Sequence, residues 1–293
     1  MNLRRRAIVG VAIAAAFGAA VGPAVPRWSR CAARSGTEIF SGIVYGCEVL
    51  PITAEGRGVV QWVRVDLSAP GIELYVTPLD PAAVRKGWQY RLAWIEDVVR
   101  TERLAVAING TMFDSASGWR IRLPGELAKT AEMVVADHVP AFGQFWQADY
   151  LLWFDERLTP HLADTRPPPL SAIDKATWAI SGGTFGLRDG RVWPDTDRRP
   201  DARTAAAIDR KRKLLFLAVA DWISPHRLFV ELARLGAKDA ILLDGGSSTT
   251  MAIGSGAALA PTGVLVGGSR PVATYLGVRA RRLALPDPAR PSY

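Results

Sequence analysis

The chain has 293 residues, of which 49% are hydrophobic and 22% are charged, so it can bury a core as one large domain or two medium ones. This composition excludes disorder over most of the length. The formal charge of +8 favours anionic partners such as envelope phosphates or acidic glycans. Its basic residues are scattered apart from residues 210–213 and 279–282, so the chain is not typical of a nucleic-acid-binding protein.

The N-terminus has the three parts of a secretory signal. Arginines occupy positions 4–6, an uncharged apolar stretch covers residues 7–22, and the small residues Gly22 and Ala24 precede a possible cleavage site. We therefore expect a signal peptide over residues 1–24, a periplasmic or secreted protein, and no stable membrane span after cleavage. An uncleaved anchor is the alternative, although a stretch of 16 residues is short for a bilayer. Loss of the three arginines lowers the charge to +5.

Both cysteines, Cys31 and Cys47, follow this segment. In an oxidising compartment they could pair and attach the mature N-terminus to the first strand, or they could be two unrelated thiols. No lipid anchor is expected, because Trp28, Ser29 and Arg30 precede Cys31. We expect an N-terminal extension over residues 25–57, a single catalytic domain over 58–283 and a C-terminal tail over 284–293.

The first half of the domain shows both periodicities. Residues 59–67 and 72–77 are separated by turn residues and predict a hairpin. Residues 90–100 have helical spacing, and the apolar strand expected over 104–108 ends in polar residues 109–114. Residues 115–176 are the least readable part, where we expect insertions or strand-rich decoration.

The second half is clearer. A strand over residues 178–182 enters a glycine turn, and residues 203–208 and 214–220 predict a hairpin around the basic turn. Ser224 and Pro225 predict a helix start, and Gly236 its end. Strands follow over 239–243 and 272–278. The order predicts an α+β fold: a mixed, mostly antiparallel sheet with packed helices in a single catalytic domain.

Residues 241–251 are the most informative segment. An apolar run ends in Asp244, Gly245 and Gly246, followed by four hydroxyl residues, which suits either an ordinary turn or an active site at a strand end. Similar chemistry ends two other strands, at Asn109-Gly110 with Asp114 nearby, and at Ser181-Gly182-Gly183. The 203–220 hairpin adds Arg203 and Thr204, and the last strand adds Arg270.

In this order the pieces resemble the phosphodiester glycosidase family over roughly residues 59–281. The matching pieces are residues 107–110 with Phe113, 179–183, 203–205, 235–237 leading to 243–251, and 270–272. Two positions depart from the family pattern: Thr111 and Ser247 stand where the family usually has glycine. Both add a side chain beside the presumed ligand, which affects the choice of substrate more than the fold.

The resemblance implies an exported hydrolase that cleaves the glycosyl–phosphate bond of a sugar 1-phosphodiester in envelope or extracellular glycans. Such cleavage needs a carboxylate near the anomeric carbon and cations near the phosphate. Asp244 is the first choice for the carboxylate, as electrostatic stabiliser, nucleophile or base. Asp114 and Asp221 are second choices for a partner role. Arg203 and Arg270 are expected to hold phosphate oxygens.

The expected substrate-binding residues share these strand ends: Asn109, Gly110, Gly182, Gly183, Arg203, Thr204, Gly245, Gly246, Ser247, Ser248, Thr249 and Arg270. Among the aromatic residues, Trp119 and Trp222 lie beside motif segments and are candidates for sugar contact. His138, His161 and His226 belong to no recognisable triad and are expected to be structural or on the surface.

No cofactor is expected, because no residues have the spacing of a tight zinc site. A weak Ca²⁺ or Mg²⁺ held by Asp244 and phosphate oxygens stays open. Within enzymes, an ordinary glycosidase or a transferase is the alternative. Outside enzymes, the alternative is a non-catalytic glycan-binding or envelope polysaccharide assembly protein that uses the same pocket.

Overall fold

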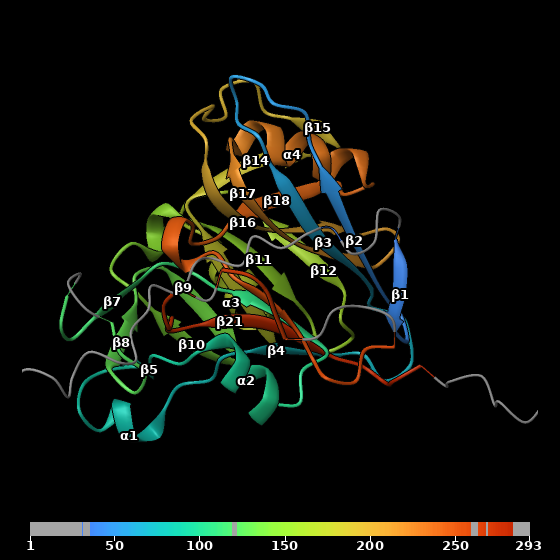
Figure 1. Ribbon diagram of the computed structural model, residues 1–293. Coiled ribbons are helices and arrows are strands. Elements are labelled where there is room, and N and C mark those ends of the chain that lie inside the picture. The colour runs from blue at the N-terminus through green and yellow to red at the C-terminus, as the bar shows by residue number, and fades with distance from the viewer. Residues whose placement is uncertain (1–30, 32–35, 119–121, 259–262, 268, 284–293) are drawn as a thin grey trace, which may run out of the picture.

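Strands dominate the regular structure in the computed structural model, which describes residues 31, 36–118, 122–258, 263–267 and 269–283 (Figure 1). These residues form four sheets and four α-helices, of which the longest has 10 residues. The expected α+β class is therefore wrong, and the fold is mostly β. The helical patterns mark short helices, and the regular structure described in the unreadable segment 115–176 is mainly strand, with one α-helix of six residues. The expected signal peptide, Trp119 and the expected C-terminal tail lie outside the described residues.

The largest sheet has eight strands, all paired antiparallel. Their order is β1 (Thr37–Phe40), β2 (Ile43–Val49), β3 (Val59–Asp66), β17 (Leu214–Ile223), β16 (Asp201–Asp209), β18 (Asp239–Leu242), β14 (Thr184–Arg188) and β15 (Arg191–Val192). The predicted hairpin around residues 210–213 is confirmed as β16 and β17.

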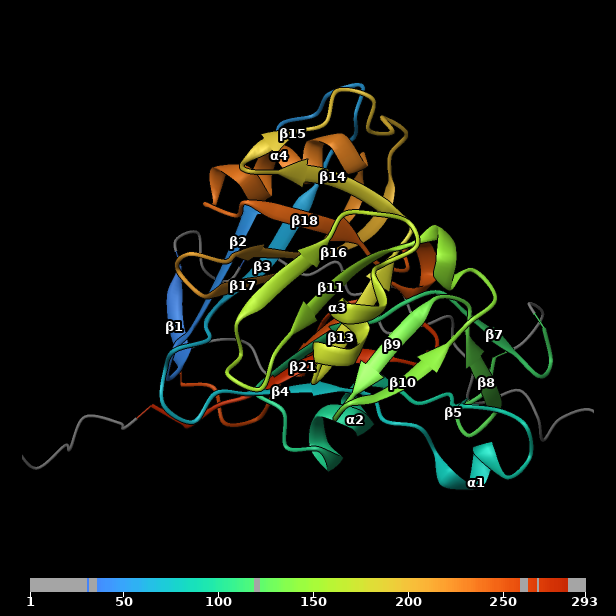
Figure 2. The same cartoon turned by 180° about the vertical axis from the view of Figure 1, so that it is seen from behind.

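Three smaller sheets complete the fold (Figures 1 and 2). The second sheet has the order β10 (Val139–Phe142), β9 (Met133–Ala136), β13 (Trp178–Gly182), β11 (Tyr150–Phe154) and β12 (Pro160–Ala163). The third has the order β20 (Gly263–Val266), β19 (Met251–Ile253), β6 (Val106–Asn109), β21 (Tyr275–Arg279) and β4 (Glu73–Val76). The fourth has the order β5 (Tyr90–Arg91), β8 (Leu127–Thr130) and β7 (Phe113–Ser115).

The hairpin expected over residues 59–77 is wrong. Both strands exist, but β3 pairs with β2 and β17, whereas β4 pairs with β21 in the third sheet. The turn between them carries the chain from the first sheet to the third. Turn residues show where a strand ends but not which strand it pairs with.

A central core lies where the first three sheets meet. It contains Val65 and Leu217 from the first sheet, Leu152 from the second, and Ile108 and Leu276 from the third. The central strands of the first sheet are buried on both faces, since alternate residues of β17 pack against the central core or under helix α4. This double burial explains why β16 and β17 read as continuous apolar runs.

Each helix of more than one turn covers the outer face of one sheet. Helix α4 (Pro225–Arg234) packs on the first sheet, α3 (Leu170–Lys175) on the second and α2 (Ile95–Thr101) on the third, while α1 (Pro81–Val84) is a single turn. Figure 2 shows α4 and α2 at opposite ends of the molecule. The predicted cap of α4 is confirmed, because Ser224 Oγ accepts a hydrogen bond from Arg227 N at 3.1 Å.

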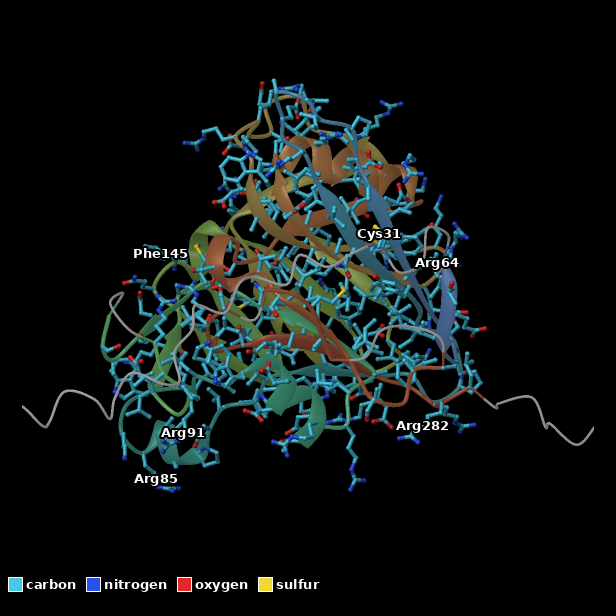
Figure 3. The ribbon with its side chains drawn as sticks, in the orientation of Figure 1. Cys31, Arg64, Arg85, Arg91, Phe145 and Arg282 are labelled. Carbon is cyan, nitrogen blue, oxygen red and sulfur yellow. A yellow bond between two sulfur atoms is a disulfide. The ribbon has the colours of Figure 1, made fainter. Side chains whose placement is uncertain are left out.

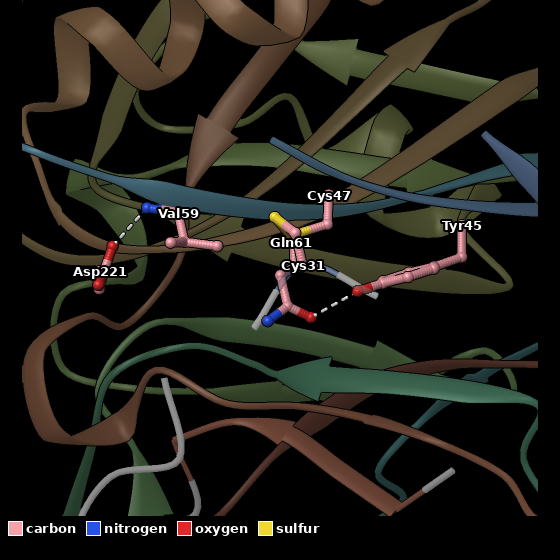
Figure 4. Close-up of a disulfide and its surroundings, with 6 residues drawn as sticks. All are labelled: Cys31, Tyr45, Cys47, Val59, Gln61 and Asp221. Atoms are coloured by element: carbon pink, nitrogen blue, oxygen red, sulfur yellow. Dashed lines mark hydrogen bonds between the residues drawn. A yellow bond between two sulfur atoms is a disulfide. The ribbon is translucent and has the colours of Figure 1, made fainter. Parts of the chain in front are cut away.

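Residues of the expected N-terminal extension join the first sheet as β1 and β2. Cys31 and Cys47 form a disulfide that attaches the chain before β1 to β2 (Figure 4). The domain boundaries drawn from the sequence stay a prediction. No helix in the described part of the chain is long and apolar enough to cross a membrane. Arg64, Arg282 and the neighbouring pair of Arg85 and Arg91 lie in different parts of the molecule (Figure 3), in keeping with the scattered charge of the sequence.

Candidate functional site

Three strand ends converge on one point, which we call the Asp244 site. Asp244 follows β18, Asn109 ends β6 and Gly182 ends β13. Asn109 Nδ2 donates a hydrogen bond to the backbone oxygen of Asp244 at 2.7 Å, and Asp244 N donates to the oxygen of Gly110 at 3.1 Å. A Cβ on Gly182 would lie 1.9 Å from the oxygen of Leu242, so only glycine allows β13 to approach β18 this closely.

Asn109 organises this convergence from within. Its side chain is fully buried, and its Oδ1 accepts hydrogen bonds from Thr204 Oγ1 at 2.7 Å and from Thr250 N at 3.0 Å. One amide thus connects β6, β16 and the segment after Asp244. Asn109 and Thr204 use these polar atoms within the protein, which gives them a positioning role in this structure.

The Asp244 carboxylate is the negative centre of the site. Its side chain is 15% exposed, and its Oδ2 lies 3.5 Å from Arg270 Nη2. Arg270 Nε also donates to Ser248 Oγ at 3.0 Å, and Ser248 hydrogen-bonds the carboxylate. Burial raises the pKa of Asp244, while Ser248, Arg270 and the N–H of Gly245 oppose that rise.

A second cation, Arg122, lies beside Arg270. The guanidinium carbons of Arg122 and Arg270 are 4.3 Å and 5.6 Å from the centroid of the Phe113 ring. Burial and repulsion from Arg122 both lower the pKa of Arg270, and attraction to Asp244 opposes this. Two guanidinium groups facing one carboxylate leave positive charge available to an anion. Sequence reasoning missed Arg122, because no recognisable motif stands next to it in the least readable part of the sequence.

Two buried acids, Glu132 and Asp149, were also missed. Their residues are 1% and 3% exposed. Burial, with repulsion from Asp149 and Asp244, raises the pKa of Glu132 to about 9. Burial raises the pKa of Asp149 to about 6, against the attraction of Arg166. At neutral pH Glu132 therefore holds a proton, whereas Asp149 is mostly ionised. The one trace in the sequence is an acid directly before each of the apolar strands β9 and β11.

Buried polar atoms without partners are concentrated around this point. In the described chain, eight buried side-chain nitrogen or oxygen atoms have no hydrogen-bond partner. Five of them belong to residues in or beside the site: Arg122 Nε, Glu132 Oε2, Asp149 Oδ2, Arg203 Nε and Thr249 Oγ1. Since buried polar groups nearly always find partners, these are atoms that a bound ligand or water would satisfy.

Comparison with known proteins places this geometry in a family. Residues 102–279 match the model of the phosphodiester glycosidases. This chain belongs to the phosphodiester glycosidase family. The resemblance read from the motifs is confirmed, and the chain is a glycosidase-type hydrolase by family. A search of curated proteins finds no match.

Two solved structures share the fold of this phosphodiester glycosidase. The first is the zebrafish N-acetylglucosamine-1-phosphodiester alpha-N-acetylglucosaminidase catalytic domain, auto-inhibited by its pro-peptide. Its TM-score is 0.57 at 17% identity, with 86% of this chain and 87% of that chain covered. The second is a hypothetical protein from Synechocystis, with a TM-score of 0.55 at 16% identity over 82% of this chain and 62% of that chain.

The remaining motif residues lie in or beside the segment that follows Asp244. Gly246 adopts a φ of +58° and begins the short 3-10 helix η2 (Gly246–Ser248). Ser247 is exposed, whereas Thr249 is buried. Arg203 lies beside this segment, since a Cβ on Gly245 would be 3.9 Å from its Cδ. Its Nη2 donates to the oxygen of Arg199 at 3.0 Å.

Asp114 and Asp221 make their contacts elsewhere. Asp114 is exposed and accepts a hydrogen bond from Gln144 Nε2 at 3.4 Å. Asp221 accepts one from Val59 N at 2.6 Å, which attaches β17 to β3 (Figure 4). Trp222 is 55% exposed beside Gly56. None of these contacts in the described part of the chain joins the three residues to Asp244, so their roles at the site stay predictions.

The three histidines contact residues other than Asp244. His226 hydrogen-bonds Glu55, His161 stacks on Trp153, and His138 lies near Glu156. None of the three contacts the Asp244 site through these interactions. Within the described ranges, no group of three or more His, Cys, Asp or Glu residues is arranged to hold a metal ion.

Proposed function

We propose that this protein hydrolyses the glycosyl–phosphate bond of sugar 1-phosphodiesters, and that it acts after export on envelope or extracellular glycans. The observation that carries the proposal is the pairing of charges at the Asp244 site. The largely buried carboxylate of Asp244 lies against Arg270, and Arg122 lies beside Arg270 over the same aromatic ring. Family membership supports the reaction class.

The two kinds of charge match the two ends of the bond that breaks. When the bond between the anomeric carbon and the bridging oxygen breaks, its electron pair stays with the phosphate. Positive charge grows on the sugar ring, where the Asp244 carboxylate stabilises it. Negative charge grows on the phosphate, which guanidinium groups bind through paired hydrogen bonds. Water supplies the hydroxyl that completes the sugar.

A simple glycoside, whose leaving group is uncharged, would be stabilised less by a second arginine. Arg122 and Arg270 repel each other, and Asp244 neutralises only one charge. An anionic ligand that accepted hydrogen bonds from both would relieve this repulsion, and the unpaired Nε of Arg122 is placed for such a bond. This argument favours a phosphodiester over an uncharged leaving group.

The test is a screen of the purified protein against sugar phosphodiesters and matched simple glycosides, with released sugar as the readout. We expect a preference for the diesters. Asp244→Asn keeps the size of the side chain and should lower turnover by about 10³-fold or more, because the charge that stabilises the transition state is lost. Asp239→Asn, at the other end of β18, is the matched comparison for an acid away from Asp244.

The contrary outcomes are separate. Equal or greater activity on simple glycosides would overturn the phosphodiester assignment and favour an ordinary glycosidase or a transferase. Equilibrium binding without product would indicate a glycan-binding protein. Near-normal turnover by folded Asp244→Asn would remove Asp244 from the reaction.

A further inference from the structure

We infer that Glu132 is the proton donor of the Asp244 site and that Asp149 is a positioning residue that keeps the Glu132 proton in place. This inference rests on the proposed hydrolysis and adds a catalytic residue that the motifs do not contain. Its basis is the placement of two buried carboxyls around the space at Gly183.

Gly183 lies between these acids and the surface. It is exposed, whereas Glu132 and Asp149 beneath it are buried. A Cβ on Gly183 would lie 3.6 Å from Asp149 Oδ1 and 3.8 Å from Glu132 Oε1. The backbone of Gly183 does not have a positive φ, so glycine is not required here for conformation. Because residue 183 is glycine, it places no side chain against the two carboxyl groups on that side.

Each carboxyl keeps one oxygen unbonded. Glu132 Oε2 and Asp149 Oδ2 have no hydrogen-bond partner, although both are buried. The backbone groups of Met112 and Gly183 hydrogen-bond the Glu132 carboxyl. The carboxyl is thus held in place while it retains a free oxygen. An unpaired buried oxygen is costly to a fold unless a ligand uses it.

The charges around Glu132 favour its protonated form. The acids Asp149 and Asp244 both raise the pKa of Glu132, while the nearby cations act mainly on those two acids: Arg166 on Asp149, and Arg122 and Arg270 on Asp244. Burial and these two negative charges raise the pKa of Glu132 to about 9. A carboxylic acid that is still protonated at neutral pH is suited to donate its proton.

The proposed step is a hydrolysis in which Glu132 protonates the leaving group. The bond between the anomeric carbon and the bridging oxygen breaks, the electron pair passes to that oxygen, and the oxygen takes the proton from Glu132. Water gives its hydroxyl to the anomeric carbon and its own proton to the carboxylates of the site, from which the Glu132 proton is restored. No oxidant, reductant or further reactant is needed.

The experiment compares Glu132→Gln with the wild type on two diesters of the same sugar 1-phosphate, a methyl ester and a 4-nitrophenyl ester. Glutamine keeps the shape but cannot give up a proton. We expect kcat on the methyl ester to fall by about 10²–10⁴-fold. The fall on the 4-nitrophenyl ester should be about 10-fold smaller, because a more acidic leaving group needs less protonation. The alkaline limb of the wild-type pH profile should disappear in the variant.

Two further variants complete the test. Asp149→Asn should move the alkaline limb to lower pH, because one of the charges that retain the proton is gone. Asp239→Asn is the matched control, since Asp239 is a partly buried acid with a raised pKa at the other end of β18. It should leave both the rates and the pH profile unchanged.

The outcomes distinguish the two proposals. Equal losses by Glu132→Gln on both esters with an unchanged pH profile would overturn Glu132 as proton donor and leave the hydrolase assignment intact. A wild type that cleaves only simple glycosides would overturn the substrate assignment, and the same comparison on methyl and 4-nitrophenyl glycosides would still decide the role of Glu132. A wild type that cleaves neither class would overturn both.

Discussion

Residues of the site fall into two groups according to how they reach it. Asp244 and Asn109 stand at strand ends and Arg270 lies in the loop before β21, all within ordered motifs, so sequence reasoning could find them. Glu132 and Arg122 lie in a segment without readable periodicity, and sheet pairing brings them to the site. A motif records what lies together along the chain, whereas the pKa of a buried acid depends on what lies together in space.

Glu132 should lower the stability of the protein at neutral pH. Its pKa is about 9 in the folded protein against a usual value of 4.5, so protonation favours the folded state. This contribution is complete below about pH 4.5 and is lost as the pH rises towards 9. Glu132→Gln avoids that loss, because glutamine does not ionise.

Urea unfolding of the wild type and Glu132→Gln at pH 5 and pH 7 measures this effect. The advantage of the variant should grow by on the order of 2 kcal/mol between the two pH values. A constant difference would contradict the raised pKa. Such a variant, more stable but less active, would illustrate the conflict between stability and function at a site.

At the scale of elements, the predictions succeeded where partners are close in the sequence. The hairpin of β16 and β17 and the capped helix α4 depend on local turns and local periodicity. The pairing of β4 with β21 joins segments about 200 residues apart, and no local pattern specifies it. The helix content was overestimated because the helical spacing over residues 90–100 also fits the short strand β5 followed by a two-turn helix.

The junction of β13 and β14 contains two adjacent glycines with different requirements. Gly182→Ala places a methyl 1.9 Å from a backbone oxygen of β18, so it should reduce stability by several kcal/mol, about 3 or more. Gly183→Ala makes only ordinary van der Waals contacts, so the fold should remain while the methyl covers the two acids. We expect at least about a tenfold loss of kcat/KM, as for a lost transition-state contact.

Thermal unfolding and steady-state kinetics of the two variants separate these effects. Gly182→Ala should show its defect in the melting temperature, and Gly183→Ala in the rate. Wild-type activity in Gly183→Ala would show that substrate does not approach the acids from that side.

At the scale of the molecule, three sheets close around one core and the N-terminal segment is attached covalently to it. Cys47 belongs to the central core, and its bond to Cys31 closes a segment with a sequence separation of 16. Loop-closure entropy predicts that reduction costs about 3 kcal/mol of unfolding free energy. Urea titrations of the wild type with and without reductant, and of the Cys31→Ala, Cys47→Ala double variant, measure it. No effect of reductant on the wild type would contradict this contribution.

The hydrogen bonds around Asn109 also affect how readily this residue deamidates. An Asn-Gly pair in a flexible chain deamidates readily, because the following backbone nitrogen attacks the side-chain amide. Here that nitrogen, Gly110 N, donates to the oxygen of Thr274 at 2.7 Å, and Asn109 Oδ1 holds two donors. Deamidation therefore has to wait for unfolding, after which a carboxylate at residue 109 would face the backbone oxygen of Asp244, where Nδ2 now donates. Each long period of unfolding therefore risks deamidation of Asn109, after which its hydrogen bond to the Asp244 backbone would not form again.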